Sequence, residues 1–268
     1  MIDYPNIDPV LLSIGPIKIR WYGIAYVIGI LGGYSYIKYI LNKYYPLHTI
    51  NKDHISNGLT WLIIGIIIGG RLGHVIFYDI EYYINYPVQI VNTLQGGMSF
   101  HGGLIGVIVS AYFYSKKSKI SLLKFFDCLA IATPIGLFFG RIANFINGEL
   151  YGRVTSLPWG MVFPNGGPFP RHPSQIYEAL LEGLSLFIIL FIFAKNKALN
   201  VKGITSSIFL IMYGIFRFLV EFVREQESYV DYFYWGTTLG QWLTVPFIVI
   251  GFIMLYKSIN RVKEEKNG

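Results

Sequence analysis

The sequence predicts an all-α integral membrane protein, a polytopic bundle of about seven transmembrane helices. Hydrophobic residues make up 53% of the 268 positions, charged residues only 14%, and the mean hydropathy is +0.48. These values lie outside the usual range of soluble domains. The apolar residues form long runs, whereas a membrane β-barrel requires alternating segments of about ten residues. Helices are therefore the expected spanning elements.

Each predicted helix corresponds to one apolar run. A hydrocarbon core of about 30 Å is crossed by about 20 helical residues. Seven runs approach that length, at residues 21–37, 58–77, 99–114, 122–139, 177–193, 204–223 and 239–256. The connections contain no proline-rich or low-complexity linker, and the sequence has no clear internal repeat. We therefore expect one transmembrane domain over residues 1–268.

Lysine and arginine in the connections predict the orientation. Fourteen of them follow the first, third, fifth and seventh runs, and six lie in the connections on the opposite side. Because cytoplasmic loops are enriched in positive residues, the amino terminus is predicted outside and the carboxyl terminus in the cytoplasm. This topology and the attraction to anionic headgroups explain the net charge of +7, so no nucleic-acid partner is expected.

Residues 1–20 are predicted to form an outer arm. Asp3, Asp8 and three prolines interrupt this segment, which leaves no apolar core for a cleavable signal peptide. The single cysteine, Cys128, excludes a disulfide framework or a cysteine metal site within one chain. The sequence has no HExxH motif and no carboxylate cluster at ligand spacing, so neither a metal nor another cofactor is expected.

Residues 140–153 place two arginines, two asparagines, a glutamate and three glycines directly after an apolar run. They include Arg141, Asn144, Glu149 and Gly152. Arginine presents a planar fork of donors that suits phosphate or carboxylate, asparagine adds directed hydrogen bonds, and glycine lets backbone amides approach a ligand. We expect an anion-binding site in an outer loop region over residues 140–176. The alternative is a polar loop whose charges only face water.

Two further arginines, Arg71 and Arg217, interrupt apolar runs. At about 1.5 Å per residue each lies about 20 Å from the inner end of its helix, in the outer third. Charges at this depth usually face the bundle interior or a wet cavity, which favours a functional role. The alternatives are snorkelling to the interface and a structural ion pair. For Arg217 the partner would be Glu221, one turn away, and Tyr213 lies one turn before it.

A histidine between glycines opens the third predicted helix. His101 follows Gly96 and Gly97 and precedes Gly102 and Gly103. Such glycines favour close approach by another molecule, and imidazole is a frequent proton acceptor. The alternative is a histidine with a purely structural contact.

Polar residues also precede the fifth predicted helix. Residues 171–175 lead into it, and Glu178 and Glu182 follow. Tyr22, beside Trp21, and the aromatic residues 232–235 are interpreted from their positions as members of the interfacial aromatic belt.

Residues 140–153 fit the form GRxxNFxNGExxGR. This stretch resembles the signature of the bacterial phosphatidylglycerol–prolipoprotein diacylglyceryl transferase family. Further blocks resemble that family in the same order, at residues 20–23, 69–71, 96–106, 171–175 and 213–224. Ala143 stands where many members have glycine, and the loop 154–170 is shorter than in some members. The resemblance spans nearly the whole chain.

The resemblance implies transfer of the diacylglyceryl group from phosphatidylglycerol to the lipobox cysteine thiol of a prolipoprotein, with release of glycerol 1-phosphate. This is the first step of bacterial lipoprotein maturation. It also implies a multi-pass protein of the bacterial cytoplasmic (inner) membrane whose active site faces the outer leaflet. The chemistry requires help in forming the thiolate, and arginines at low dielectric stabilise a departing phosphate without a metal.

The family motifs also imply roles for individual residues. His101 is the expected general base, and Arg141 and Arg217 are expected to bind and stabilise the phosphate. An arginine-assisted mechanism without the histidine is the alternative. The residues expected to bind substrate are Arg141, Asn144, Glu149, Gly152, Tyr22, Tyr213 and Glu221.

Two other classes of function fit parts of the sequence. A lipid or anion transporter would also bury arginines, but it would have polar groups through the inner half of the bundle, where Asp127 is the main one. A noncatalytic scaffold or receptor would explain the helices. It gives no reason for histidine, asparagine and arginine to gather at one depth.

Overall fold

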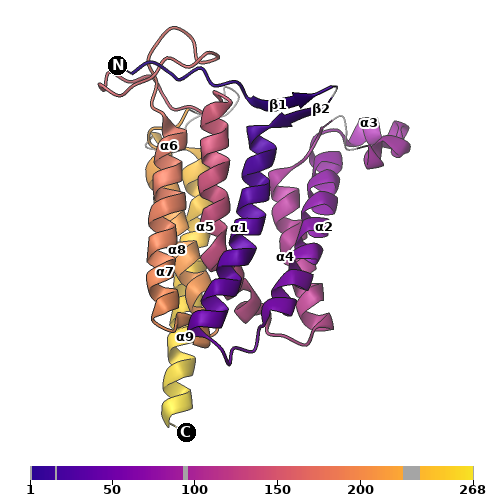
Figure 1. Ribbon diagram of the computed structural model, residues 1–268, viewed down its shortest axis with the longest axis vertical. Coiled ribbons are helices and arrows are strands. Elements are labelled where there is room, and N and C mark those ends of the chain that lie inside the picture. Colours follow the sequence, from indigo (N-terminus) through magenta and orange to yellow (C-terminus); the bar gives the residue numbers. More distant parts are fainter. Residues whose placement is uncertain (1, 16, 93–95, 226–235, 268) are drawn as a thin grey trace. The chain divides into compact units, whose positions relative to one another are not determined.

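The computed structural model describes residues 2–15, 17–92, 96–225 and 236–267 (Figure 1). The belt aromatics expected at residues 232–235 lie outside these ranges. In chain order the elements are β1 (Val10–Ile14), β2 (Ile17–Arg20), α1 (Trp21–Tyr44), α2 (Lys52–Phe77), α3 (Ile80–Asn85), η1 (Pro87–Val91), α4 (Phe100–Lys117), α5 (Leu122–Ile146), α6 (Ser174–Glu178), η2 (Ala179–Ser185), α7 (Leu186–Lys195), η3 (Ala198–Asn200), α8 (Ile204–Val220) and α9 (Leu239–Asn267).

Each predicted apolar run corresponds to a helix in this structure. Five spans in the described ranges are long and apolar enough to cross a membrane, and they are Trp21–Tyr44, Lys52–Phe77, Leu122–Ile146, Ser174–Lys195 and Leu239–Glu264. The predicted third and sixth runs form α4 and the shorter apolar helix α8. The prediction of a helical, polytopic membrane protein is confirmed.

The hairpin of β1 and β2 adds a small antiparallel sheet to the predicted outer arm. Leu12 pairs with Ile19 and Ser13 with Lys18. The turn passes through Gly15, whose φ of 58° suits a residue without a side chain. Because β2 ends at Arg20 and α1 begins at the next residue, the arm continues directly into the first helix.

Helix α5 differs from its predicted extent. It continues through residues 140–146, which were expected to be part of a loop. Ile142, Phe145 and Ile146 extend the apolar run, and the helix ends just before Gly148, which adopts a φ of 65°. Glycine in the left-handed conformation is a common helix terminator. Arg141 and Asn144 therefore project from a helix rather than from a loop.

The chain forms two compact units, which are described separately. One contains residues 1–46 and 126–268, and the other contains residues 47–125. In the smaller unit, α2 and α4 touch through glycines. A Cβ built on Gly73 would lie 2.7 Å from the Cα of Gly102, and one on Gly69 would lie 2.8 Å from the Cα of Gly106. Small residues of this kind let transmembrane helices approach closely.

In the larger unit, glycines also set the helix spacing. A Cβ on Gly29 of α1 would lie 2.9 Å from the Cα of Gly136 in α5. A Cβ on Gly183 of η2 would lie 2.7 Å from the Cβ of Phe138 in α5. Helices α8 and α9 lie side by side (Figure 1). A Cβ built on Gly214 of α8 would lie 2.6 Å from Cγ1 of Ile248 in α9. These contacts bring η2 against α5 one turn from Arg141.

The start of α8 is held by a carboxylate from another helix. Asp127 of α5 accepts hydrogen bonds from the amides of Gly203 at 2.6 Å and Ser206 at 2.8 Å. It also accepts from the hydroxyls of Thr205 and Ser206. The amides at a helix start have no partner inside the helix. The main polar residue expected in the inner half is therefore used as a helix cap.

Polar and apolar side chains are distributed as expected for a membrane protein. Glu178 and Glu182 are completely buried, whereas Ile68 is 54% exposed. Exposed aliphatic side chains suit contact with lipid tails, while ionisable groups inside spanning segments usually face the protein interior. The buried carboxylates therefore mark the part of the larger unit that requires a functional explanation.

Candidate functional site

Six charged side chains meet inside the larger unit. They come from α5, α6, η2, α8 and the segment that directly follows α8. We call them the arginine–glutamate cluster. Its members are Arg141, Arg217, Arg224, Glu178, Glu182 and Glu221.

Glu178 lies at the centre of the cluster. Its Oε2 is 3.2 Å from Nε of Arg141. Its Oε1 accepts a hydrogen bond from Nη1 of Arg217 and another, 2.8 Å long, from Nη1 of Arg224. Because the side chain of Glu178 is 0% exposed, these three guanidinium groups provide its charge compensation.

Arg217 contacts three glutamates. Its Nη2 lies 3.1 Å from Oε2 of Glu221, which confirms the ion pair considered from the sequence. Its Nη1 also contacts Glu178 and lies 3.8 Å from Oε1 of Glu182. The Glu221 pair is thus one part of a larger network. Arg141 completes that network, with Nη2 3.4 Å from Oε2 of Glu182.

The local backbone explains why both glutamates face the arginines. Glu178 ends α6, and Glu182 follows four residues later in the π-helical segment η2. Residues four apart lie close to one face of such a segment, and π-helical turns often occur at functional sites. Neither glutamate had a role among the predictions made from the sequence, although both were noted there. The available signal was two acidic residues, four apart, at the start of an apolar run.

The charges of the cluster balance when all six groups are ionised. Three guanidinium groups face three carboxylates. The side chains of Glu178 and Glu182 are 0% exposed, whereas those of Arg141 and Arg217 are 17% and 15% exposed. The carboxylates are therefore the inner layer, and the partly exposed guanidinium groups are the surface that an anion can reach. Charge-assisted hydrogen bonds are strong in such surroundings.

Asn144 and Glu149 fix the chain that follows α5. Nδ2 of Asn144 donates to Oε1 of Glu149 at 2.8 Å. Nε2 of Gln175 donates to the carbonyl of Glu149 at 2.6 Å, and the hydroxyl of Ser174 donates to that of Leu150 at 3.0 Å. These bonds tie the end of α5 to the start of α6, which carries Glu178.

Gly152 lies where three chain segments meet. Its amide donates to the carbonyl of His172 at 2.8 Å, and it forms an antiparallel bridge with Arg224. A Cβ at this position would lie 2.7 Å from the Cβ of His172. A side chain would therefore separate the segment that carries Arg224 from the segment that leads to Glu178.

One tyrosine, Tyr213, and one histidine, His172, border this region. Tyr213 stacks on Phe209 with ring centroids 5.7 Å apart, and it interacts electrostatically with Glu182 and Arg217. His172, outside the spanning helices, has its Nδ1 3.3 Å from the hydroxyl of Tyr177. Burial lowers the pKa of His172, so its ring is neutral near pH 7.

Tyr22 and His101 have other surroundings. Tyr22 lies in the first turn of α1, where its ring packs against Tyr26 at 5.1 Å. His101 belongs to the smaller unit, is exposed, and has its ring 5.6 Å from that of Phe100. Arg141, Arg217 and Glu221 are thus joined directly, and contact of Tyr22 or His101 with a substrate stays a prediction.

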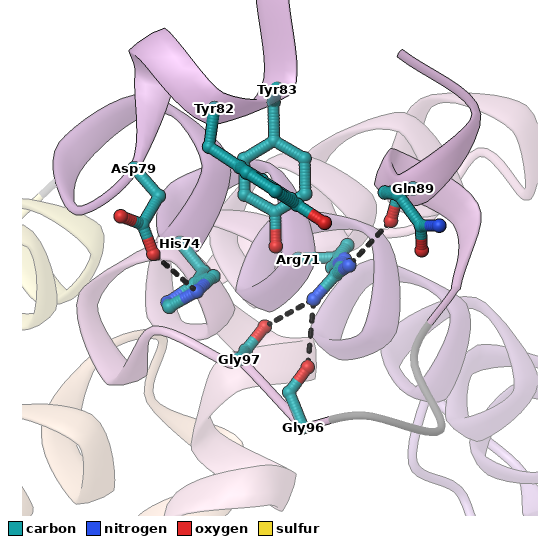
Figure 2. Close-up of a pocket in the computed structure, with 8 residues that line it drawn as sticks. All are labelled: Arg71, His74, Asp79, Tyr82, Tyr83, Gln89, Gly96 and Gly97. Atoms are coloured by element: carbon teal, nitrogen blue, oxygen red, sulfur yellow. Dashed lines mark hydrogen bonds and ion pairs between the residues drawn. The ribbon is translucent and has the colours of Figure 1, made fainter. Parts of the chain in front are cut away.

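Arg71 has a structural role in the smaller unit. It lines an open cavity of about 450 Å³ together with His74, Asp79, Tyr82, Tyr83, Gln89, Gly96 and Gly97 (Figure 2). Its guanidinium donates five hydrogen bonds of 2.6–3.1 Å to the backbone carbonyls of Gln89, Ile90, Asn92, Gly96 and Gly97. A guanidinium has five N–H donors. The functional role favoured for Arg71 by its depth is therefore not supported.

The glycines around His101 are also explained within the protein. Gly96 and Gly97 adopt φ values of 84° and 80° and give their carbonyls to Arg71. Gly102 packs against the backbone of α2. These contacts and conformations account for three of the four glycines, so the approach of another molecule to His101 stays a prediction.

The chain is similar to known proteins over nearly its whole length. The family model described as prolipoprotein diacylglyceryl transferase matches residues 9–257. A Rickettsia felis protein named phosphatidylglycerol–prolipoprotein diacylglyceryl transferase is 47% identical over 258 residues, covering 96% of this chain and 99% of the relative. Proteins with the same name from Rickettsia rickettsii and Pseudomonas aeruginosa are 48% and 45% identical, covering 96% and 97% of this chain and 99% and 97% of the relatives.

Proposed function

Because the chain belongs to the prolipoprotein diacylglyceryl transferase family, we propose that it transfers the diacylglyceryl group of phosphatidylglycerol to the lipobox cysteine thiol of a prolipoprotein. The sulfur forms a thioether bond with carbon 3 of the glyceryl unit. The bond between that carbon and the phosphate oxygen breaks, and glycerol 1-phosphate leaves. Apolar spanning helices suit a lipid substrate, and membership of this family does not favour the transporter alternative.

The arginine–glutamate cluster is the observation that carries the proposal for the site. Arg141 and Arg217 are anchored on buried carboxylates and remain 17% and 15% exposed. Fixed donors of this kind need little reorganisation when negative charge develops on a departing phosphate. Their planar forks also match phosphate oxygens. Both arginines are therefore the proposed phosphate-binding groups, and Arg224 is held beside them by Glu178.

Activation of the thiol is assigned to His101. A free thiol has a pKa of about 8.5, so a neighbouring base increases the fraction present as the reactive thiolate. In the proposed step the thiol proton moves to the imidazole as the sulfur attacks the glyceryl carbon. His101 is exposed at the start of α4, which is compatible with access by a peptide. Arginine-assisted thiolate formation without His101 is the alternative.

The other site residues are proposed to shape the lipid site. Asn144 and Glu149 hold the chain after α5, and Gly152 keeps three segments together. Tyr213 and Glu221 flank Arg217, and Tyr22 is proposed to contact substrate from the start of α1.

The membrane setting of the reaction follows from charge. The uneven distribution of lysine and arginine supports an outside amino terminus and a cytoplasmic carboxyl terminus. We place the protein in the bacterial cytoplasmic membrane as a single transmembrane domain, with the cluster facing the outer leaflet.

A transfer assay tests the proposal. The purified protein in detergent is supplied with phosphatidylglycerol that carries radiolabel in the transferred glyceryl unit, and with a lipobox peptide. We expect label on the peptide and one glycerol 1-phosphate per transfer, and no label on a peptide whose cysteine is replaced by serine. A stable protein that binds the lipid but transfers nothing would contradict the proposal. Lipid movement across a bilayer without transfer would instead indicate a transporter.

A further inference from the structure

We propose that binding of phosphatidylglycerol at the arginine–glutamate cluster takes up one proton, and that Glu182 accepts it. This inference rests on the proposed function and concerns the charge balance of the same site. It extends the role of the cluster from phosphate binding to proton-coupled binding.

The starting point is the charge balance without a ligand. Arg141, Arg217 and Arg224 are matched by Glu178, Glu182 and Glu221, so the ionised cluster has no net charge. A phosphodiester adds one negative charge. In a buried site this excess charge is poorly screened by water and is costly. Uptake of one proton restores the balance.

Glu182 is the carboxylate with the weakest compensation. Glu178 contacts three guanidinium groups, with Arg141 at 3.2 Å and Arg224 at 2.8 Å. Glu221 pairs with Arg217 at 3.1 Å, and its side chain is 8% exposed. Glu182 is completely buried and lies 3.4 Å from Arg141 and 3.8 Å from Arg217. One oxygen of each of the three glutamates has no hydrogen-bond partner within the described ranges, but the ion-pair distance of that oxygen is 3.8 Å for Glu182, against 3.2 Å for Glu178 and 3.1 Å for Glu221.

The groups facing Glu182 explain how a bound anion changes the protonation state of this glutamate. Arg141 faces it from α5, Arg217 and Tyr213 from α8, and Glu178 from α6. A phosphate that draws hydrogen bonds from Arg141 and Arg217 removes the only two cations that compensate Glu182 within the described chain. A buried charge left without its partner is strongly unfavourable. Protonation from solvent removes that charge, and release of the anionic product returns the proton.

The test is calorimetric titration of the full-length protein in detergent with dioctanoyl phosphatidylglycerol. Comparing buffers that differ in ionisation enthalpy gives the number of protons taken up. We expect uptake of about one proton per lipid bound. The affinity for the lipid should weaken by about tenfold for each unit rise in pH wherever a full proton is taken up. Glu182→Gln, which mimics the neutral acid, is expected to bind the lipid without proton uptake and without this pH dependence.

Two controls define the source of the proton. Glu225→Gln changes a carboxylate that is 44% exposed and paired with Arg171 at 3.2 Å, outside the cluster, so the uptake should be unchanged. Dioctanoylglycerol has no phosphate and should cause no uptake. Wild-type binding without proton uptake would overturn the inference, and so would undiminished uptake by Glu182→Gln.

If Glu182→Gln does not fold, the wild-type measurement still tests proton uptake, because pH-independent binding alone overturns the inference. Transfer is measured on the same preparation. Transfer with binding but no proton uptake rejects the inference and leaves the proposed function intact. Absence of both binding and transfer from the folded protein rejects both.

Discussion

Arginine is used in two different ways in this protein. Arg71 donates all five of its hydrogen bonds to backbone carbonyls, so it stabilises the connection between α2 and α4 in the smaller unit. Arg141 and Arg217 contact carboxylates and keep part of their side chains exposed. A ligand can therefore share the guanidinium groups of Arg141 and Arg217, whereas Arg71 has no donor to offer.

Replacement of Arg141 or Arg217 by lysine tests the importance of guanidinium geometry. Lysine keeps the charge but cannot bridge Glu178 and Glu182 while also presenting a planar fork to phosphate. We expect Arg141→Lys and Arg217→Lys each to lower transfer by about two orders of magnitude or more, as for loss of a fixed anion-stabilising donor. Transfer and thermal stability are measured together, with Arg261→Lys at an exposed position as the control.

Full transfer by both lysine variants would reject the phosphate-binding role. The structure also gives a prediction for Arg217→Leu combined with Glu221→Leu. This double change leaves Glu178 and Glu182 without one of their cations, so it does not remove a self-contained pair. We therefore expect it to lose stability as well as activity.

The role of His101 is tested by His101→Ala. We expect turnover to fall by about two to four orders of magnitude if the imidazole is the general base. Its exposure at the start of α4 predicts little change in thermal stability. His48→Ala, in the connection before α2, is a matched histidine control. Near-normal turnover in folded His101→Ala protein would favour the arginine-assisted mechanism.

At the scale of elements, short irregular segments position the charged groups. The π-helical η2 follows directly after α6, so Glu178 and Glu182 both face the arginines. Gly183 lets η2 contact α5 at Phe138, one turn before Arg141. Changes in these segments are therefore expected to affect the cluster without altering any of its charged residues.

The cap of α8 gives a prediction about stability. Asp127→Ala removes the acceptor for the amides of Gly203 and Ser206, which are buried at the start of the helix. We expect a loss of about 1–3 kcal/mol, the usual cost of leaving buried hydrogen-bonding groups unsatisfied. Asp127→Asn retains one acceptor oxygen and should lose less. Thermal unfolding measures both, with the exposed Asp3→Ala as control, and equal stability of all three variants would contradict the capping role.

At the scale of the whole molecule, the site faces the outer leaflet only if the helices cross the membrane in the predicted orientation. The lysine-rich connection 116–124 is predicted in the cytoplasm, and the connection between α5 and α6 on the outer side. Reporter fusions after Lys119 and after Pro158 should give opposite signals. A reporter after Lys119 that reads as external would reverse the orientation and place the cluster toward the cytoplasmic leaflet.

The sequence by itself determined the helical membrane class, the approximate positions of the spanning helices and the polar stretch 140–153. Length, hydropathy and residue type are local properties, so they can be read without knowing which helices meet. The pairing of Arg217 with Glu221 was also accessible, because residues four apart on a helix are neighbours.

Only the tertiary structure decided which polar groups act together. Arg141 meets Glu178 and Glu182 from positions far away in the sequence, and Asp127 meets the start of α8. Tertiary contacts also distinguish Arg71 from the arginines that a phosphate can share, because backbone carbonyls use all the donors of Arg71. The physical reason is that charge compensation depends on contact distance and burial, and packing between distant segments sets both.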